Sequence, residues 1–94
     1  MIDGEHIGYY GGGEIYSMIN YLDGKRNGEF IRYFTNVVIS FKCNYLGGKR
    51  DGECIVYYES GEIGFKYYYI DGKRVTELEW IYYNRNVKLE LIGL

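Results

Sequence analysis

The sequence predicts an all-β fold: an antiparallel β-meander of about eight strands that forms a curved, open sheet. Two observations support this prediction. A segment recurs along the chain, because residues 21–29 return 24 positions later as residues 45–53 and begin a third time at 69–74. Within each copy the apolar residues alternate, which is typical of strands with one buried face. A fixed period of about 20–50 residues indicates an architecture of stacked repeats.

The repeat predicts a single domain, residues 1–94, made of four β-hairpin units. The chain begins part-way through a unit, because residues 3–10 match residues 51–58. Composition agrees with strands: 13 Tyr favour them, and Ala, the best helix former, is absent. The four units cover approximately residues 1–20, 21–44, 45–68 and 69–94.

Each unit is expected to contain two strands and two kinds of turn. A short turn divides the unit, at residues 11–13, 35–36 and 59–61, where Gly and Asn supply positive φ. A longer turn, Asp-Gly-Lys-Arg-x-Gly, leads to the next unit. The residues of one parity, expected to share the buried face of the second and third units, are Ile31, Tyr33, Ile39, Phe41, Cys43, Tyr45, Ile55, Tyr57, Ile63, Phe65, Tyr67 and Tyr69.

The fourth unit departs from the pattern. Thr76 replaces the Gly of earlier units, and the alternation slips by one residue so that Trp80 fills a buried strand position. The chain then ends in an apolar edge strand from Leu89 to Leu94, without a neighbour in the chain. Edges of this kind are often covered or paired with a second chain, so a homodimer through this strand is one expectation.

The pattern Tyr-x-x-Gly-Lys-Arg-x-Gly-Glu, followed by Tyr-Tyr-x-x-Gly-x-Ile, resembles the bacterial variant of the MORN repeat, found in small antitoxins of the YwqK type. The resemblance covers essentially the whole chain and is strongest over residues 21–74. It implies an elongated, curved antiparallel sheet that binds proteins or, as in eukaryotic relatives, phospholipids and dimer partners. Val37 and Val38 depart from it, because the other copies carry Gly-Glu there.

No catalytic, cofactor or metal site is expected. His6 is the only histidine, and its neighbour Glu5 points to the opposite face. The glutamates that recur in the repeat have near-identical environments, unlike a catalytic carboxylate pair. The two cysteines, Cys43 and Cys54, fall on opposite parities and are interpreted as reduced, which favours a cytoplasmic protein. No apolar run approaches the ~18 residues that span a bilayer.

The aromatic side chains are the candidate functional surface. Tyr can bury its ring while its hydroxyl stays hydrated, and it makes rigid protein contacts. We therefore expect a non-enzymatic protein-binding module, and the resemblance implies that it is an inhibitor or antitoxin that neutralises a toxin or defence enzyme. The candidate partner-binding residues are Tyr10, Tyr33, Phe34, Tyr57, Tyr58, Trp80 and Tyr82.

Three basic pairs in the longer turns suggest an alternative. They would form a rim able to bind anionic nucleic acid or lipid, as an adaptor. A further alternative is a phage-encoded inhibitor of a bacterial defence system that targets nucleic acid. Against the rim, the net charge is -2 and the same turns carry aspartates. The rim residues are Lys25, Arg26, Lys49, Arg50, Lys73 and Arg74.

Overall fold

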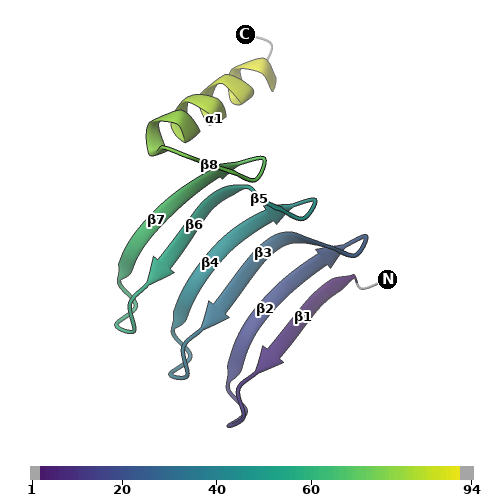
Figure 1. The fold of residues 1–94 in the computed structure, drawn as a ribbon, viewed down its shortest axis with the longest axis vertical. Helices are drawn as coiled ribbons and strands as arrows, with labels where there is room; N and C mark the ends of the chain where they lie inside the picture. The colour runs from purple at the N-terminus through teal and green to yellow at the C-terminus, as the bar shows by residue number, and fades with distance from the viewer. Residues whose placement is uncertain (1–2, 92–94) are drawn as a thin grey trace.

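A computed structural model describes residues 3–91 as one open sheet of eight strands followed by a single helix (Figure 1). The predicted all-β meander is confirmed, because the sheet order β1-β2-β3-β4-β6-β7-β8 follows the chain and only the short β5 lies off this path, paired with β4. The elements are β1 (Gly4–Tyr9), β2 (Ile15–Leu22), β3 (Lys25–Tyr33), β4 (Ile39–Leu46), β5 (Lys49–Arg50), β6 (Gly52–Tyr57), β7 (Ile63–Ile70), β8 (Lys73–Val75) and α1 (Glu77–Leu91).

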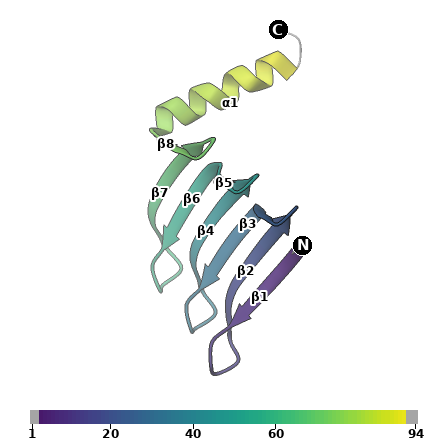
Figure 2. The ribbon, with the colours of Figure 1, turned by 45° about the vertical axis from the view of Figure 1, so that its right-hand side comes forward.

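The sheet is a single bent layer (Figures 1 and 2). The radius of gyration is 15.4 Å, against about 12 Å for a compact domain of this length. Because no second layer covers the strands, few side chains are fully enclosed. The small core consists of Phe30, Cys43, Tyr45 and Cys54.

The turns between units are tighter than the sequence suggests. Asp23 and Gly24 form a two-residue turn in which both have positive φ, 52° and 76°, the conformation that hairpins of this length prefer. Gly47-Gly48 and Asp71-Gly72 repeat it. The prediction of a longer turn here is wrong, because the following Lys-Arg pair already belongs to the next strand. The second Gly of the motif, at Gly28, occupies a β-bulge with φ 93°.

The turns within units are longer and repeat closely. The backbone N–H of Tyr10 donates to the carbonyl of Glu14, and the N–H of Gly13 donates to the carbonyl of Tyr10, at 2.8 and 2.9 Å. The same pair of bonds recurs one and two periods later. At the third loop position the first and third units have glycine at positive φ, whereas the second has Val37 with φ 68°.

Val37 is in a conformation that a β-branched residue rarely adopts, and we predict that Val37→Gly stabilises the protein. The left-handed region costs a residue with a Cβ about 1–2 kcal/mol, and the Val37 side chain is 57% exposed, so little packing is lost. Chemical denaturation should give a free energy of unfolding higher by about 1 kcal/mol. Gly61→Val at the equivalent position is the matched control, and it should lower the free energy of unfolding. A less stable Val37→Gly protein contradicts the explanation.

The side chains of one parity do not share one face, which corrects the sequence interpretation. A two-residue turn pairs Leu22 with Lys25, so facing residues have opposite parity in successive strands. Ile31 therefore lies opposite Lys42, whereas Phe41 lies opposite Arg32 on the other face. Each face contains both apolar and charged side chains.

The same register brings the two cysteines together. Phe41 pairs with Val56 and Lys42 with Ile55, so Cys43 and Cys54 face each other across β4 and β6 with Cα atoms 4.2 Å apart, and they form a disulfide. Both are almost fully buried. The interpretation of these cysteines as reduced is wrong, because the register places residues of opposite parity on β4 and β6 side by side.

The fourth unit is a helix rather than a hairpin. Thr76 caps it: its Oγ1 accepts from the N–H of Glu79 and its own N–H donates to Oε1 of Glu79, both at 3.1 Å. This reciprocal pair is a capping box, which removes unsatisfied N–H groups from the first turn. Trp80 is thus helical, and its ring packs 5.0 Å from that of Tyr68 at the end of the sheet.

The predicted edge strand at the C-terminus is also wrong within the described residues. From Leu89 to Leu91 the chain belongs to α1, and residues 92 to Leu94 lie outside the part that the structure describes. Residues 89–91 therefore offer no strand for the expected homodimer, which stays a prediction.

Candidate binding face

Cross-strand register defines a face that combines arginines with aromatic rings, here called the arginine face. Direct pairs place Tyr21 beside Arg26, Tyr45 beside Arg50 and Tyr69 beside Arg74. In the described strands no Asp or Glu lies on this face, because Glu5, Glu29 and Glu53 all occupy the opposite parity in their strands. The arginine face consists of His6, Ser17, Ile19, Tyr21, Arg26, Phe30, Arg32, Phe41, Cys43, Tyr45, Arg50, Cys54, Val56, Phe65, Tyr67, Tyr69 and Arg74.

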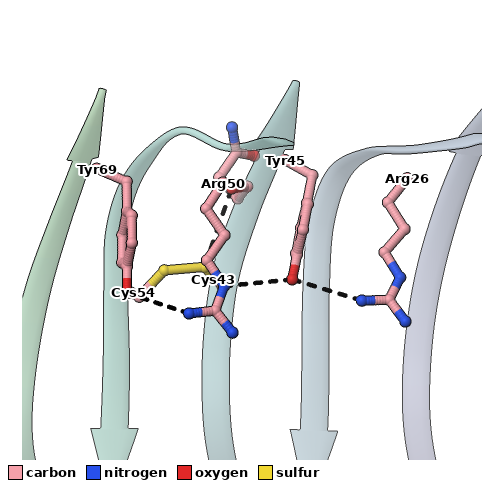
Figure 3. Close-up of a disulfide and its surroundings, with 7 residues drawn as sticks. Arg26, Cys43, Tyr45, Arg50, Cys54 and Tyr69 are labelled. Carbon is pink, nitrogen blue, oxygen red and sulfur yellow. Dashed lines mark hydrogen bonds between the residues drawn. A yellow bond between two sulfur atoms is a disulfide. The ribbon is translucent and has the colours of Figure 1, made fainter. Parts of the chain in front are cut away.

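A ladder of hydrogen bonds links arginines and tyrosines of successive units across this face (Figure 3). The hydroxyl oxygen of Tyr45 accepts from Nη1 of Arg26 at 3.5 Å and from Nε of Arg50 at 3.4 Å. Arg50 also donates through Nη1 to the hydroxyl of Tyr69 at 3.1 Å. Since a phenol oxygen that accepts these bonds keeps its own O–H to donate, the ladder offers hydrogen-bond donors to solvent.

Ionisation of Tyr45 reflects this environment. Burial by itself would raise the pKa of the Tyr45 phenol, but the hydrogen bonds and charges of Arg50 and Arg26 outweigh it and hold that pKa below its ordinary value. The hydrogen bond to Tyr45 in turn raises the pKa of Arg50. The guanidinium groups are thus fixed in position and remain charged.

Each arginine also lies over an aromatic ring. The guanidinium carbon of Arg26 is 5.1 Å from the ring centre of Phe30, and that of Arg74 is 4.2 Å from Tyr67. Arg32 and Arg50 make equivalent contacts at 5.3 Å with Phe30 and Tyr69 respectively. Cation–π contacts of this kind contribute about 0.5–1 kcal/mol at exposed sites. They hold the arginines along the sheet instead of letting them extend freely.

The opposite side, here called the lysine face, has both signs of charge. Lys42 forms an ion pair with Glu29 at 3.7 Å, and Lys66 repeats it with Glu53 at 3.5 Å. These exposed pairs contribute at most about 1 kcal/mol each. The predicted rim of basic pairs is consequently divided, with Arg26, Arg50 and Arg74 on one face and Lys25, Lys49 and Lys73 on the other.

The predicted partner-binding aromatics do not gather on one surface. Tyr33 lies on the lysine face, where its hydroxyl donates to Sδ of Met18 at 3.4 Å, and Tyr57 repeats its strand position one period later. Tyr10 donates to the carbonyl of Tyr33 at 2.6 Å. Phe34 and Tyr58 occupy the equivalent loop positions of later units. Trp80 and Tyr82 are in α1, with Tyr82 largely exposed.

Sequence reasoning missed most of the arginine face, including Arg32, Phe30, Phe41 and Tyr45. The signal was present in the motif Tyr-x-Asp-Gly-Lys-Arg. An Asp-Gly pair between alternating strands is a strong indication of a two-residue hairpin, and such a hairpin places the Tyr directly opposite the Arg.

Comparisons with family models, with curated proteins and with solved structures found no match. The resemblance to MORN repeats therefore stays a prediction. In the described part of the chain no helix has the length and apolar character needed to cross a membrane. Among the side chains that the structure describes, those of residues 3–85, no group of three or more His, Cys, Asp or Glu is arranged to hold a metal ion.

Proposed function

We propose that the protein is a non-enzymatic binding module that docks through its arginine face onto an acidic surface of a protein partner, as an inhibitor or antitoxin would. The observation that carries this proposal is the Arg26–Tyr45–Arg50–Tyr69 ladder, on a face to which the described strands contribute no Asp or Glu. Arg and Tyr are the residues most enriched in the energetic centres of protein interfaces. Their fixed positions lower the entropy lost on binding.

Nucleic acid is the second candidate, because the same face pairs arginines with rings and repeats them two strands apart, about 10 Å. Two features favour protein. The guanidinium groups of Arg50 and Arg74 already lie over the rings on which bases would stack. The net charge of -2 also gives little long-range attraction for phosphates.

The disulfide bears on location. Disulfides persist in oxidising compartments and are rare in the cytosol, so the buried Cys43–Cys54 bond favours an oxidising compartment over the cytoplasmic location expected from sequence. The proposed partner is then one that meets the protein there.

Affinity capture with matched triple variants tests the proposal. Replacing Arg26, Arg50 and Arg74 by alanine should abolish recovery of the partner, because the interface loses its charged hydrogen-bond donors. Replacing Lys25, Lys49 and Lys73 by alanine removes the same charge from the lysine face and should leave recovery unchanged. Circular dichroism checks that both variants fold.

Three outcomes contradict the proposal: two of the capture experiment and one of an oligonucleotide-binding assay. Equal recovery by both variants, or loss with the lysine variant alone, removes the arginine face as the docking surface. Binding of a single-stranded oligonucleotide that falls steeply with salt and is lost in the arginine variant selects nucleic acid instead.

A further inference from the structure

The two ends of the sheet each have a free strand edge. β1 pairs only with β2, and along its other side its backbone groups have no neighbouring strand in the described chain. At the opposite end β8 pairs only with residues 68–70 of β7. The remainder of β7, from Ile63 to Tyr67, pairs with no strand of residues 3–91 on that side, because the chain turns into α1 at Thr76 where the repeat would have supplied a strand (Figure 1).

These two edges are the two halves of an interface that the chain already makes twice, between β2 and β3 and between β4 and β6. β4 and β6 pair antiparallel through Phe41↔Val56 and Lys42↔Ile55. One period later, β7 carries the same Phe-Lys pair as Phe65 and Lys66. Two periods earlier, β1 carries Ile7 at the position of Ile55.

From this equivalence we infer that the protein associates head to tail, with β1 of one copy pairing antiparallel against the free part of β7 of another. Continuing the β4–β6 register places Ile7 opposite Lys66 and Gly8 opposite Phe65. His6 then meets Tyr67, at the positions that Cys54 and Cys43 occupy inside the chain. Adding a strand to an exposed edge is a common mode of recognition, and exposed edges readily template it.

Apolar surface at the β7 end supports a second copy as the occupant. α1 exposes Leu78, Ile81 and Tyr82 there, and with Ile70 and Val75 they line an open apolar hollow of about 630 Å³. Ile7, 40% exposed on β1, lies on the lysine face, the same face as Val75, which pairs with Tyr68. Pairing in this register would therefore place the exposed Ile7 of one copy on the same face of the joined sheet as the hollow of the other. Because the interface is heterologous, it extends into chains or closes into rings.

Cysteine cross-linking tests the register. His6→Cys and Tyr67→Cys copy the cross-strand positions of Cys54 and Cys43, so an oxidised mixture of the two single variants should give a disulfide-linked dimer. The double variant should give a ladder of higher oligomers. A pair shifted by one residue, Ile7→Cys with Tyr67→Cys, directs the thiols to opposite faces and is the control. Equal cross-linking of the shifted pair, or none with the matched pair, overturns the inference.

Blocking each edge tests the direction of association without new thiols. The Cα separation of 4.2 Å between Cys43 and Cys54 is typical of a cross-strand pair whose backbones form no hydrogen bonds with each other. Because bonded and non-bonded pairs alternate along antiparallel strands, the adjacent pair, Lys42 and Ile55, is joined by backbone hydrogen bonds. By equivalence the N–H groups of Ile7 and Lys66 point outward, and proline at either position removes no bond within the sheet. Circular dichroism of each variant verifies the fold.

Ile7→Pro and Lys66→Pro should each be monomeric in sedimentation, while the unsubstituted chain gains mass with concentration. Their mixture should form a dimer and stop, because each variant keeps one usable edge. If Lys66→Pro self-associates when measured by itself, the contact is symmetric β1–β1 pairing. If each of the two variants self-associates when measured by itself, the contact is made through α1. Either result, or a monomeric unsubstituted chain at all concentrations, overturns head-to-tail pairing.

Discussion

Reduction of the Cys43–Cys54 disulfide is expected to lower the free energy of unfolding by about 3 kcal/mol, the usual effect of closing a loop of this size. The cysteines are 11 residues apart in sequence. A domain of this length has roughly 5–14 kcal/mol in total, so the loss is a large fraction. The bond also joins β4 to β6, where only two residue pairs form the ladder besides the short β5. Chemical denaturation with and without reductant measures it.

Replacing both cysteines by alanine distinguishes the stability that comes from the cross-link from the stability that comes from packing of the sulfur atoms. The reduced protein keeps both sulfur atoms in the core, whereas Cys43→Ala with Cys54→Ala also removes them beside Phe30 and Tyr45. The double variant should be less stable than the reduced protein by about another 1–2 kcal/mol. Denaturation midpoints that are identical with and without reductant would show that the cross-link does not stabilise this sheet.

The meander could be predicted because its signals are local and repeated. Asp23-Gly24 and its equivalents determine where the chain reverses, and alternation determines where strands run. The division of residues between faces could not be obtained from parity alone, because it depends on the exact number of residues in each turn. One residue more or less transfers every later side chain to the other face. The arginine face was missed for this reason, and the same register is what places Cys43 beside Cys54.

The helix was missed for a different reason. Extending the 24-residue period to the end of the chain imposed a hairpin on residues 77–91, where alternation had already slipped. The segment Thr76-Glu77-Leu78-Glu79 is a capping-box sequence, a local signal that competes with the period. Thr76 replaces the glycine that has positive φ inside β3, at Gly28, and at the start of β6, at Gly52, and in the fourth unit the capped helix begins there instead.

Arg50→Ala is predicted to weaken binding of the captured partner more than any other single substitution on the arginine face. Arg50 donates to two tyrosines, Tyr45 and Tyr69, and it lies between them in the ladder. Residues at the centre of an interface that are held by neighbours typically cost at least 2 kcal/mol when truncated, about a 30-fold rise in Kd. Calorimetry or surface plasmon resonance measures the change.

Two further substitutions identify the cause of the loss. Arg50→Lys keeps the charge but loses the forked geometry that reaches Tyr45 and Tyr69 together. If the position of the guanidinium group matters, this variant should retain little of the affinity. If only the charge matters, it should retain most of the affinity. Lys49→Ala removes a charge from the adjacent residue on the lysine face and should change Kd by less than about twofold, because exposed charges away from an interface contribute little. An affinity equally sensitive to Lys49 and Arg50 would mean that the partner responds to the overall charge of the turn, since the two side chains lie on opposite faces of the same strand.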